Sequence, residues 1–186
     1  MKKNRCIISG TDVALLPFGY NEDSRECQTV KNNILNAIIR LFKENGVDEF
    51  YTDCSFGFPL WGGEIVTGLM LYNDIRLYVV FPYENQPFRY TVNWRDRFYK
   101  VHKLSTDVIP MYTEQDTDGK PSFSTDKEML DKKAADYMLA DCGRLLFCGD
   151  GRGCYLYDEA VRRGCEVLAL NVVNPGGLGE SRGGLK

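Results

Sequence analysis

The 186-residue sequence has one histidine and no Cys-x-x-Cys pair, and both shortages restrict its chemistry. The sequence suggests no partner for His102, which argues against Ser/His or Cys/His nucleophilic catalysis. The seven cysteines form an odd set whose spacing matches no zinc-ligand pattern. We therefore expect no metal, no cofactor and no disulfide, and thiols that serve as small apolar residues in a reducing compartment.

Long apolar runs and an excess of basic charge are also missing. No run is long enough to cross a bilayer, and the residues after the basic N-terminus are too few to form the apolar segment of a signal peptide. We therefore expect a cytoplasmic protein that has no membrane partner. The net charge of -3 disfavours a dedicated nucleic-acid binder, although it allows a local basic groove.

Two common phosphate-binding signatures are absent. The sequence contains no GxGxxG dinucleotide fingerprint with a suitably spaced acidic residue, and it has no Walker A lysine. A nucleotide would have to be bound by other loops.

Strand-like and helix-like segments alternate along the chain. The pattern predicts strands at 5–9, 49–53, 75–81, 107–111, 145–148 and 166–172, and helices at 24–45, 60–72, 94–103, 125–141 and 155–163. This alternation, without a repeat or a linker, predicts one α/β domain over residues 1–173, with a Rossmann-like, doubly wound, mainly parallel sheet and helices on both faces. We expect the glycine-rich tail, residues 174–186, to be disordered.

Three glycine-bearing turns follow predicted strands, where open α/β sheets bind their ligands. The turns are Ser9-Gly10-Thr11, Ser55-Phe56-Gly57 and Gly149-Asp150-Gly151-Arg152-Gly153. The last two lead into helices, whose first-turn N–H groups suit a phosphate, and Arg152 can add a bidentate contact. Glycines also make tight turns in every α/β protein, but their recurrence at three strand ends favours ligand binding.

Aromatic side chains lie near two of these turns. Trp61 and Glu64 share one face of the predicted helix, so Trp61 can stack on a base while Glu64 accepts ribose hydroxyls. Alternatively, Trp61 packs on the sheet. A second segment is rich in aromatic and basic residues: Tyr83, Phe88, Arg89, Tyr90, Trp94, Arg95, Arg97, Phe98 and Tyr99. It predicts a stacking rim for a base or a single strand. Alternatively, these residues form part of the core or a dimer contact, so a homo-oligomer is possible.

The order of these segments resembles the SLOG superfamily, which includes the lonely-guy phosphoribohydrolases, DprA and the YpsA-like proteins. The resemblance is greatest to the YpsA-like branch and spans about residues 5–172. It is carried by Ser9-Gly10, Ser55-x-Gly57-x-x-x-Trp61-x-x-Glu64, the strand end 79–83 with Pro82 and Tyr83, and the turn Gly149–Gly153. It implies a Rossmann-like fold and a nucleotide-type ligand at these loops.

The sequence departs from the lonely-guy motif PGGxGTxxE. Residues 149–153 take its place, Glu159 is displaced from the position of its acid, and Asn174–Gly179 imitates it only after the last strand. We therefore expect binding or sensing of a nucleotide or nucleotide-derived ligand and leave turnover open. The alternative is hydrolysis of an N-glycosidic bond, which needs a carboxylate: Glu64 first, then Glu159 and Asp150. Binding of single-stranded DNA is a third hypothesis, which the acidic charge disfavours.

Overall fold

The computed structural model describes residues 4–113, 127–149, 151, 153–171 and 178–179. Its strands are β1 (Arg5–Gly10), β2 (Glu49–Thr52), β3 (Arg76–Phe81), β4 (Asp107–Pro110), β5 (Arg144–Cys148), β6 (Glu166–Leu170) and β7 (Leu178–Gly179). Its helices are α1 (Arg25–Asn45), α2 (Phe58–Leu69), α3 (Val92–Leu104), α4 (Lys127–Leu139) and α5 (Tyr155–Arg162), with the 3-10 turns η1 (Val13–Leu15) and η2 (Gln86–Arg89).

The strands form one sheet in the order β4-β3-β2-β1-β5-β6-β7. Strands β1 to β6 are parallel, and β7 pairs antiparallel with β6. The chain winds outward from β1 to β4 and then returns to the other side of β1 with β5. The strand order therefore reverses between β1 and β5, which confirms the predicted doubly wound, mainly parallel sheet.

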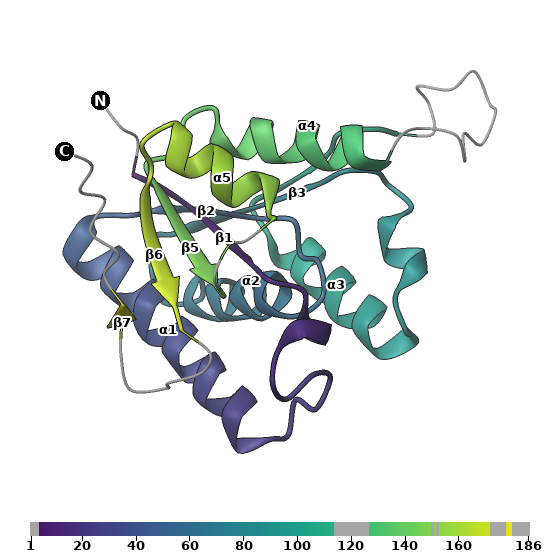
Figure 1. Ribbon diagram of the computed structural model, residues 1–186, viewed down its shortest axis with the longest axis horizontal. Coiled ribbons are helices and arrows are strands. Elements are labelled where there is room, and N and C mark those ends of the chain that lie inside the picture. Colours follow the sequence, from purple (N-terminus) through teal and green to yellow (C-terminus); the bar gives the residue numbers. More distant parts are fainter. Residues whose placement is uncertain (1–3, 114–126, 150, 152, 172–177, 180–186) are drawn as a thin grey trace.

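Helices cover both faces of this sheet, as predicted (Figure 1). Helices α1, α2 and α3 pack on one face, where the buried core includes Ile8, Ile38 and Trp61. Helices α4 and α5 pack on the other face, where it includes Ile7 and Phe147. Neighbouring residues of β1 thus contribute to opposite cores, which explains its continuous apolar sequence.

The helix ends follow local chemistry. The hydroxyl of Ser24 accepts a hydrogen bond from the Cys27 N–H at the start of α1, and Gly46 ends that helix with φ 66°. Helix α2 begins at Phe58 rather than at the predicted Leu60, because Gly57 turns the chain there with φ 95° and ψ -130°.

Of residues 174–186 the structure describes Leu178–Gly179, which form β7 and extend the sheet beyond β6. The rest of this expected disordered tail lies outside the described residues. Residues 125 and 126, where the helix predicted at 125–141 begins, lie outside the described residues.

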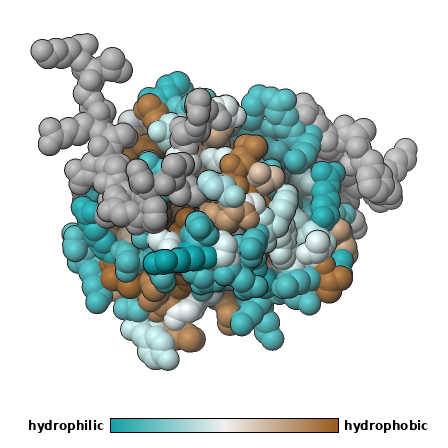
Figure 2. Space-filling view, turned by 60° about the horizontal axis from the view of Figure 1, so that its bottom comes forward, coloured by the Kyte–Doolittle hydropathy of each residue, from teal (hydrophilic) through white to brown (hydrophobic). Residues whose placement is uncertain are grey.

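The surface below the sheet carries hydrophobic side chains in small separate patches among hydrophilic ones (Figure 2). The described part of this face therefore offers no broad apolar area. No helix within the described ranges is both long and apolar enough to cross a membrane.

Candidate functional site

A cavity of about 760 Å³ lies at the carboxyl end of the parallel sheet. Its floor comes from the loops after β1, β2, β3 and β5, and its walls come from η2, α3, α4 and α5. Seven residues predicted to bind a ligand line it: Ser9, Gly10, Thr11, Ser55, Pro82, Tyr83 and Gly153. The cavity thus lies at the reversal of strand order, where open α/β sheets bind ligands.

The turns after β1 and β5 contact each other directly. The N–H of Thr11 donates to the Cys148 carbonyl at 2.8 Å. Gly149 follows with φ 116°, and a Cβ at that position would lie 2.1 Å from the Thr11 hydroxyl oxygen. Only glycine allows the two turns to approach this closely.

The turn between β5 and α5 brings a helix N-terminus to the cavity. Gly151 and Gly153 have φ values of 73° and 71°, and a Cβ on Gly151 would overlap the Tyr157 ring. The N-cap residue Cys154 makes no side-chain capping hydrogen bond, and it lines the cavity together with the first turn of α5. Backbone N–H groups of this first turn are suited to an anion. Asp150 and Arg152 lie outside the described residues.

Three aromatic side chains gather at the cavity and form what we call the aromatic cluster: Tyr20, Phe56 and Trp94. The Phe56 ring stacks on Trp94, and the Tyr20 ring lies 5.6 Å from Phe56 and 5.5 Å from Trp94 between centroids. Tyr20 is 61% exposed. The predicted stacking rim is divided, because Tyr83, Tyr90 and Trp94 line the cavity whereas Phe98 is buried in the core.

Asp53 follows β2 and presents a half-buried carboxyl group to the cavity. Its Oδ1 accepts hydrogen bonds from the N–H and the hydroxyl of Ser55, at 2.9 and 2.8 Å. Burial raises the pKa of Asp53 above its usual value, although both hydrogen bonds oppose the shift. The sequence analysis did not single out Asp53, although its place at the carboxyl end of the predicted strand 49–53 was a usable signal.

Helix α4 carries charges of both signs along the cavity wall. Lys132 pairs with Glu128 at 2.7 Å, and Lys127 lies 3.9 Å from Asp131. On the η2 side, the Arg89 guanidinium lies 5.3 Å from the centre of the Tyr83 ring. The mouth of the cavity is therefore polar, and cations stand on two of its sides.

Trp61 and Glu64 do not line the cavity but belong to a neighbouring group, the Glu22–Arg97 cluster: Glu22, Lys31, Trp61, Glu64 and Arg97. Arg97 donates two hydrogen bonds to Glu64, at 2.6 and 2.7 Å, and one to Glu22 at 2.6 Å. The other oxygen of Glu22 accepts from Lys31 at 2.7 Å and from the Trp61 indole N–H at 2.9 Å.

These contacts join the loop before α1 to α2 and α3. The hydrogen bonds to Glu64 raise the pKa of Arg97 more than burial lowers it. Burial pushes the pKa of Glu22 upward, but the hydrogen bonds from Arg97 and Lys31 outweigh it and leave that pKa below its usual value. Each member of the cluster thus has a partner. A ligand contact of Trp61 or Glu64 stays a prediction.

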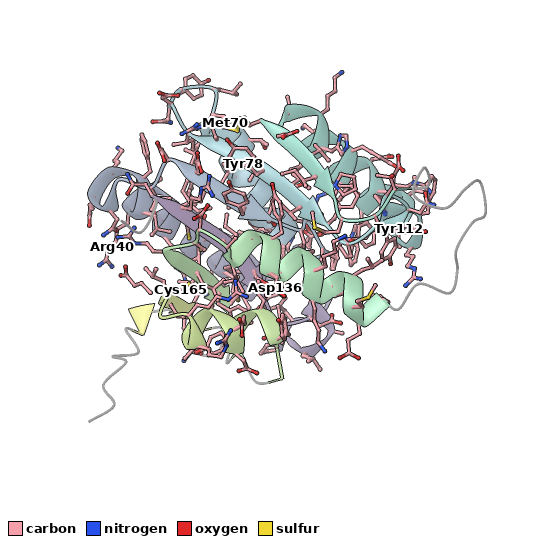
Figure 3. All side chains as sticks on the ribbon, turned by 90° about the horizontal axis from the view of Figure 1, so that it is seen from above. Arg40, Met70, Tyr78, Tyr112, Asp136 and Cys165 are labelled. Carbon is pink, nitrogen blue, oxygen red and sulfur yellow. The ribbon has the colours of Figure 1, made fainter. Side chains whose placement is uncertain are left out.

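Glu159, the second carboxylate candidate, is also paired. It accepts hydrogen bonds from Arg162 and Arg163, which lower its pKa to about 2 against the opposing effect of burial. Arg163 also donates to Asp136 of α4, which Figure 3 labels on the helix above the sheet. This arrangement ties α5 to α4.

The described residues contain no group of three or more His, Cys, Asp and Glu side chains that could hold a metal ion. The cavity residues that the sequence analysis missed include Tyr20, Asp53 and Gln86. Only the loops of a folded sheet bring these positions together, and Tyr20 carried no sequence signal.

Comparisons with known proteins agree with the resemblance. A UPF0398 protein, OB1025, of Oceanobacillus iheyensis is 27% identical over 123 residues, which cover 66% of this chain and 66% of that protein. The YpsA family model, described as the YspA SLOG family, matches residues 6–144, from β1 to the first residue of β5. The turn Gly149–Gly153 lies beyond this match. Because the match covers most of the chain, the protein belongs to the YpsA family of SLOG proteins.

Proposed function

We propose that this chain binds a nucleotide or a nucleotide-derived ligand in the cavity at the carboxyl end of the sheet. The observation that carries the proposal is the meeting of a helix N-terminus and an aromatic cluster in one cavity of about 760 Å³. That volume is in the range of small-molecule sites, roughly 300–1,000 Å³. The family supports the proposal because its SLOG relatives include nucleotide-processing proteins.

The phosphate end of the proposed site is the turn before α5. Gly153, which lines the cavity, has no side chain, so the backbone there can approach an anion. The Cys154 thiol makes no capping hydrogen bond of normal geometry, although the N–H groups of Leu156 and Tyr157 face it. Lys127 and Lys132 on the facing wall add positive charge.

The base end of the proposed site is the aromatic cluster. Stacking of a base on an aromatic ring is worth about 1–3 kcal/mol and tolerates different bases. Tyr20 leaves most of its ring in solvent, so it can cover a base without a large rearrangement of the core.

A second candidate is hydrolysis of an N-glycosidic bond, and the carboxyl of Asp53 inside the cavity favours it. In that reaction the bond from the ribose C1′ to the base nitrogen breaks, and water supplies the new C1′ oxygen. A carboxylate beside C1′ stabilises the developing positive charge. Glu64 and Glu159 are engaged by arginines, so Asp53 replaces them as the carboxylate of this candidate.

The test is a thermal-shift screen with AMP, GMP, CMP, ADP-ribose and cyclic AMP. A compound that binds only the folded protein raises the melting temperature. Tyr20→Ala should lose most of the shift, whereas the matched control Tyr72→Ala, which alters a tyrosine 87% exposed beyond α2, should keep it. Absence of a shift with every compound would contradict the proposal. Release of free base, followed by chromatography, separates hydrolysis from binding.

A further inference from the structure

Gln86 is the least satisfied polar side chain of the cavity wall. It lies in η2, lines the cavity and is only 7% exposed. Its amide nitrogen donates to the Tyr90 hydroxyl at 2.7 Å and to the Asp53 carbonyl at 3.4 Å. Its Oε1 is buried, and within the described part of the chain it is the one buried side-chain N or O atom that lacks a hydrogen-bond partner.

In the free protein, the neighbours of this amide set its orientation. The Asp53 carbonyl can only accept, so the amide nitrogen must face it, and the oxygen must face the other way. A buried oxygen without a donor typically costs about 1–3 kcal/mol. A native structure can keep such an unsatisfied oxygen where a bound partner supplies the missing hydrogen bond. The last torsion of glutamine is soft, so the amide can turn toward an entering donor.

The carboxyl group of Asp53 lies on the same wall and can also accept a further hydrogen bond. Ser55 donates two hydrogen bonds to Oδ1, and the backbone N–H of Asp53 also interacts with the carboxyl group. A carboxylate has about four lone pairs that can accept, so these three donors leave it acceptor capacity. Asp53 and Gln86 are also linked through the hydrogen bond to the Asp53 carbonyl.

We infer that Asp53 and Gln86 recognise the ligand by accepting hydrogen bonds from it, so that the ligand must present N–H or O–H donors to this wall. This inference rests on the proposed function. In a nucleotide such donors come from two sources, the 2′,3′-diol of the ribose or the exocyclic amine of the base. A phosphate has no role here, because two acceptors repel it.

The test compares variants by calorimetric titration with the tightest binder among AMP, GMP and CMP. Asp53→Asn keeps an acceptor for Ser55 but places an NH₂ group where Oδ2 was, so a donor of the ligand meets a donor. Gln86→Met keeps the length of the side chain and removes its oxygen. Both should weaken binding at least tenfold. Asp74→Asn, the matched control, removes a negative charge from the exposed turn before β3, outside the cavity lining, and should weaken it less than twofold.

Analogues then identify the source of the donors. A 2′,3′-dideoxynucleotide lacks the diol, and the deaminated nucleotide (IMP, XMP or UMP) carries a carbonyl in place of the amine. The analogue that lacks the relevant donor should bind wild type at least tenfold more weakly than the parent, and Asp53→Asn should no longer distinguish the two. An unchanged affinity for both analogues would overturn the inference.

Two further outcomes separate this inference from the proposed function. If a monophosphate binds wild type and both variants equally well, the inference fails and the proposed function stands. If no monophosphate binds, the inference fails, and the proposed function survives only where ADP-ribose or cyclic AMP raises the melting temperature.

Discussion

The cavity and the Glu22–Arg97 cluster lie side by side, and the segment from Ser55 to Glu64 contributes to both. They differ in how completely their polar groups are hydrogen-bonded. In the cluster every charge has a partner, and the Trp61 indole N–H donates to Glu22. In the cavity an oxygen of Gln86 is buried without a donor, and α5 begins without a side-chain cap.

Under the proposed function, this difference would separate the polar groups that hold the fold from those that meet a ligand. A fully satisfied network joins helices and fixes the loop before α1. Unsatisfied groups around a hollow have a cost in the free protein, and a ligand can remove it. The motif residues Trp61 and Glu64 thus differ in surroundings from Ser55, although all three belong to one motif.

The largest effect is expected from the two tryptophans of the chain. Trp61 is 1% exposed, so Trp61→Ala should lower the free energy of unfolding by about 3–5 kcal/mol, through lost packing and a lost indole donor. Trp94 is only partly buried, so Trp94→Ala should cost less stability but lower nucleotide affinity at least tenfold. Urea unfolding and titration measure the two effects. If Trp94→Ala instead cost more stability and Trp61→Ala more affinity, the contrast between the cavity and the Glu22–Arg97 cluster would be wrong.

Two glycines of the α5 turn form the next matched pair. Both have left-handed φ values, which cost a residue with a Cβ about 1–2 kcal/mol. Gly153→Ala should cost only this amount, since among the described residues no atom, apart from those of its chain neighbours, lies within 4 Å of the added Cβ. Gly151→Ala should cost about 2–4 kcal/mol, because its Cβ would lie 2.4 Å from the Tyr157 ring. Equal unfolding free energies would show that the turn adapts freely.

Glu64→Gln tests the motif directly. The amide keeps one hydrogen bond to Arg97 but loses the charge, so stability should fall by about 1 kcal/mol. A double-mutant cycle with Arg97→Lys measures the coupling. If Glu64→Gln leaves stability unchanged but weakens nucleotide binding tenfold, Glu64 contacts the ligand, as the motif predicted.

The smallest effect concerns pH. The folded pKa of Glu159 is depressed from 4.5 to about 2, so its contribution to stability is present above pH 4.5 and is lost as the pH falls toward 2. The difference in melting temperature between wild type and Glu159→Gln should therefore shrink over this interval. A difference independent of pH would mean that the arginine pairs are screened by solvent.

The sequence was sufficient for the sheet and for the strand ends at which the cavity opens. Runs such as 75–81 have a strong strand pattern, and glycines 149, 151 and 153 mark a backbone that few other residues adopt. The sequence did not reveal that Trp61 and Glu64 hydrogen-bond within the Glu22–Arg97 cluster whereas Ser55 lines the cavity. Spacing placed Trp61 and Glu64 on one helix face, but it could not reveal that Arg97, 33 residues away from Glu64, occupies that face.

The missed residues have a common physical reason. Tyr20, Asp53 and Gln86 come from three separate loops, and each one alone has the pattern of a surface position. Only the parallel register, which aligns the ends of β1, β2 and β3, brings them to one cavity. The unpartnered Oε1 of Gln86 is likewise a property of the packed structure.

The pairing of β1 with β5 also has a kinetic consequence. Cys6 of β1 lies opposite Arg144 of β5. These two central strands can pair only when the loop that contains all the residues between them has closed. Closing so long a loop is entropically costly and slows folding. The hydrogen bond from Thr11 to Cys148 depends on that step. During refolding, affinity for a nucleotide should therefore appear last, after β1 to β4 and their helices have formed.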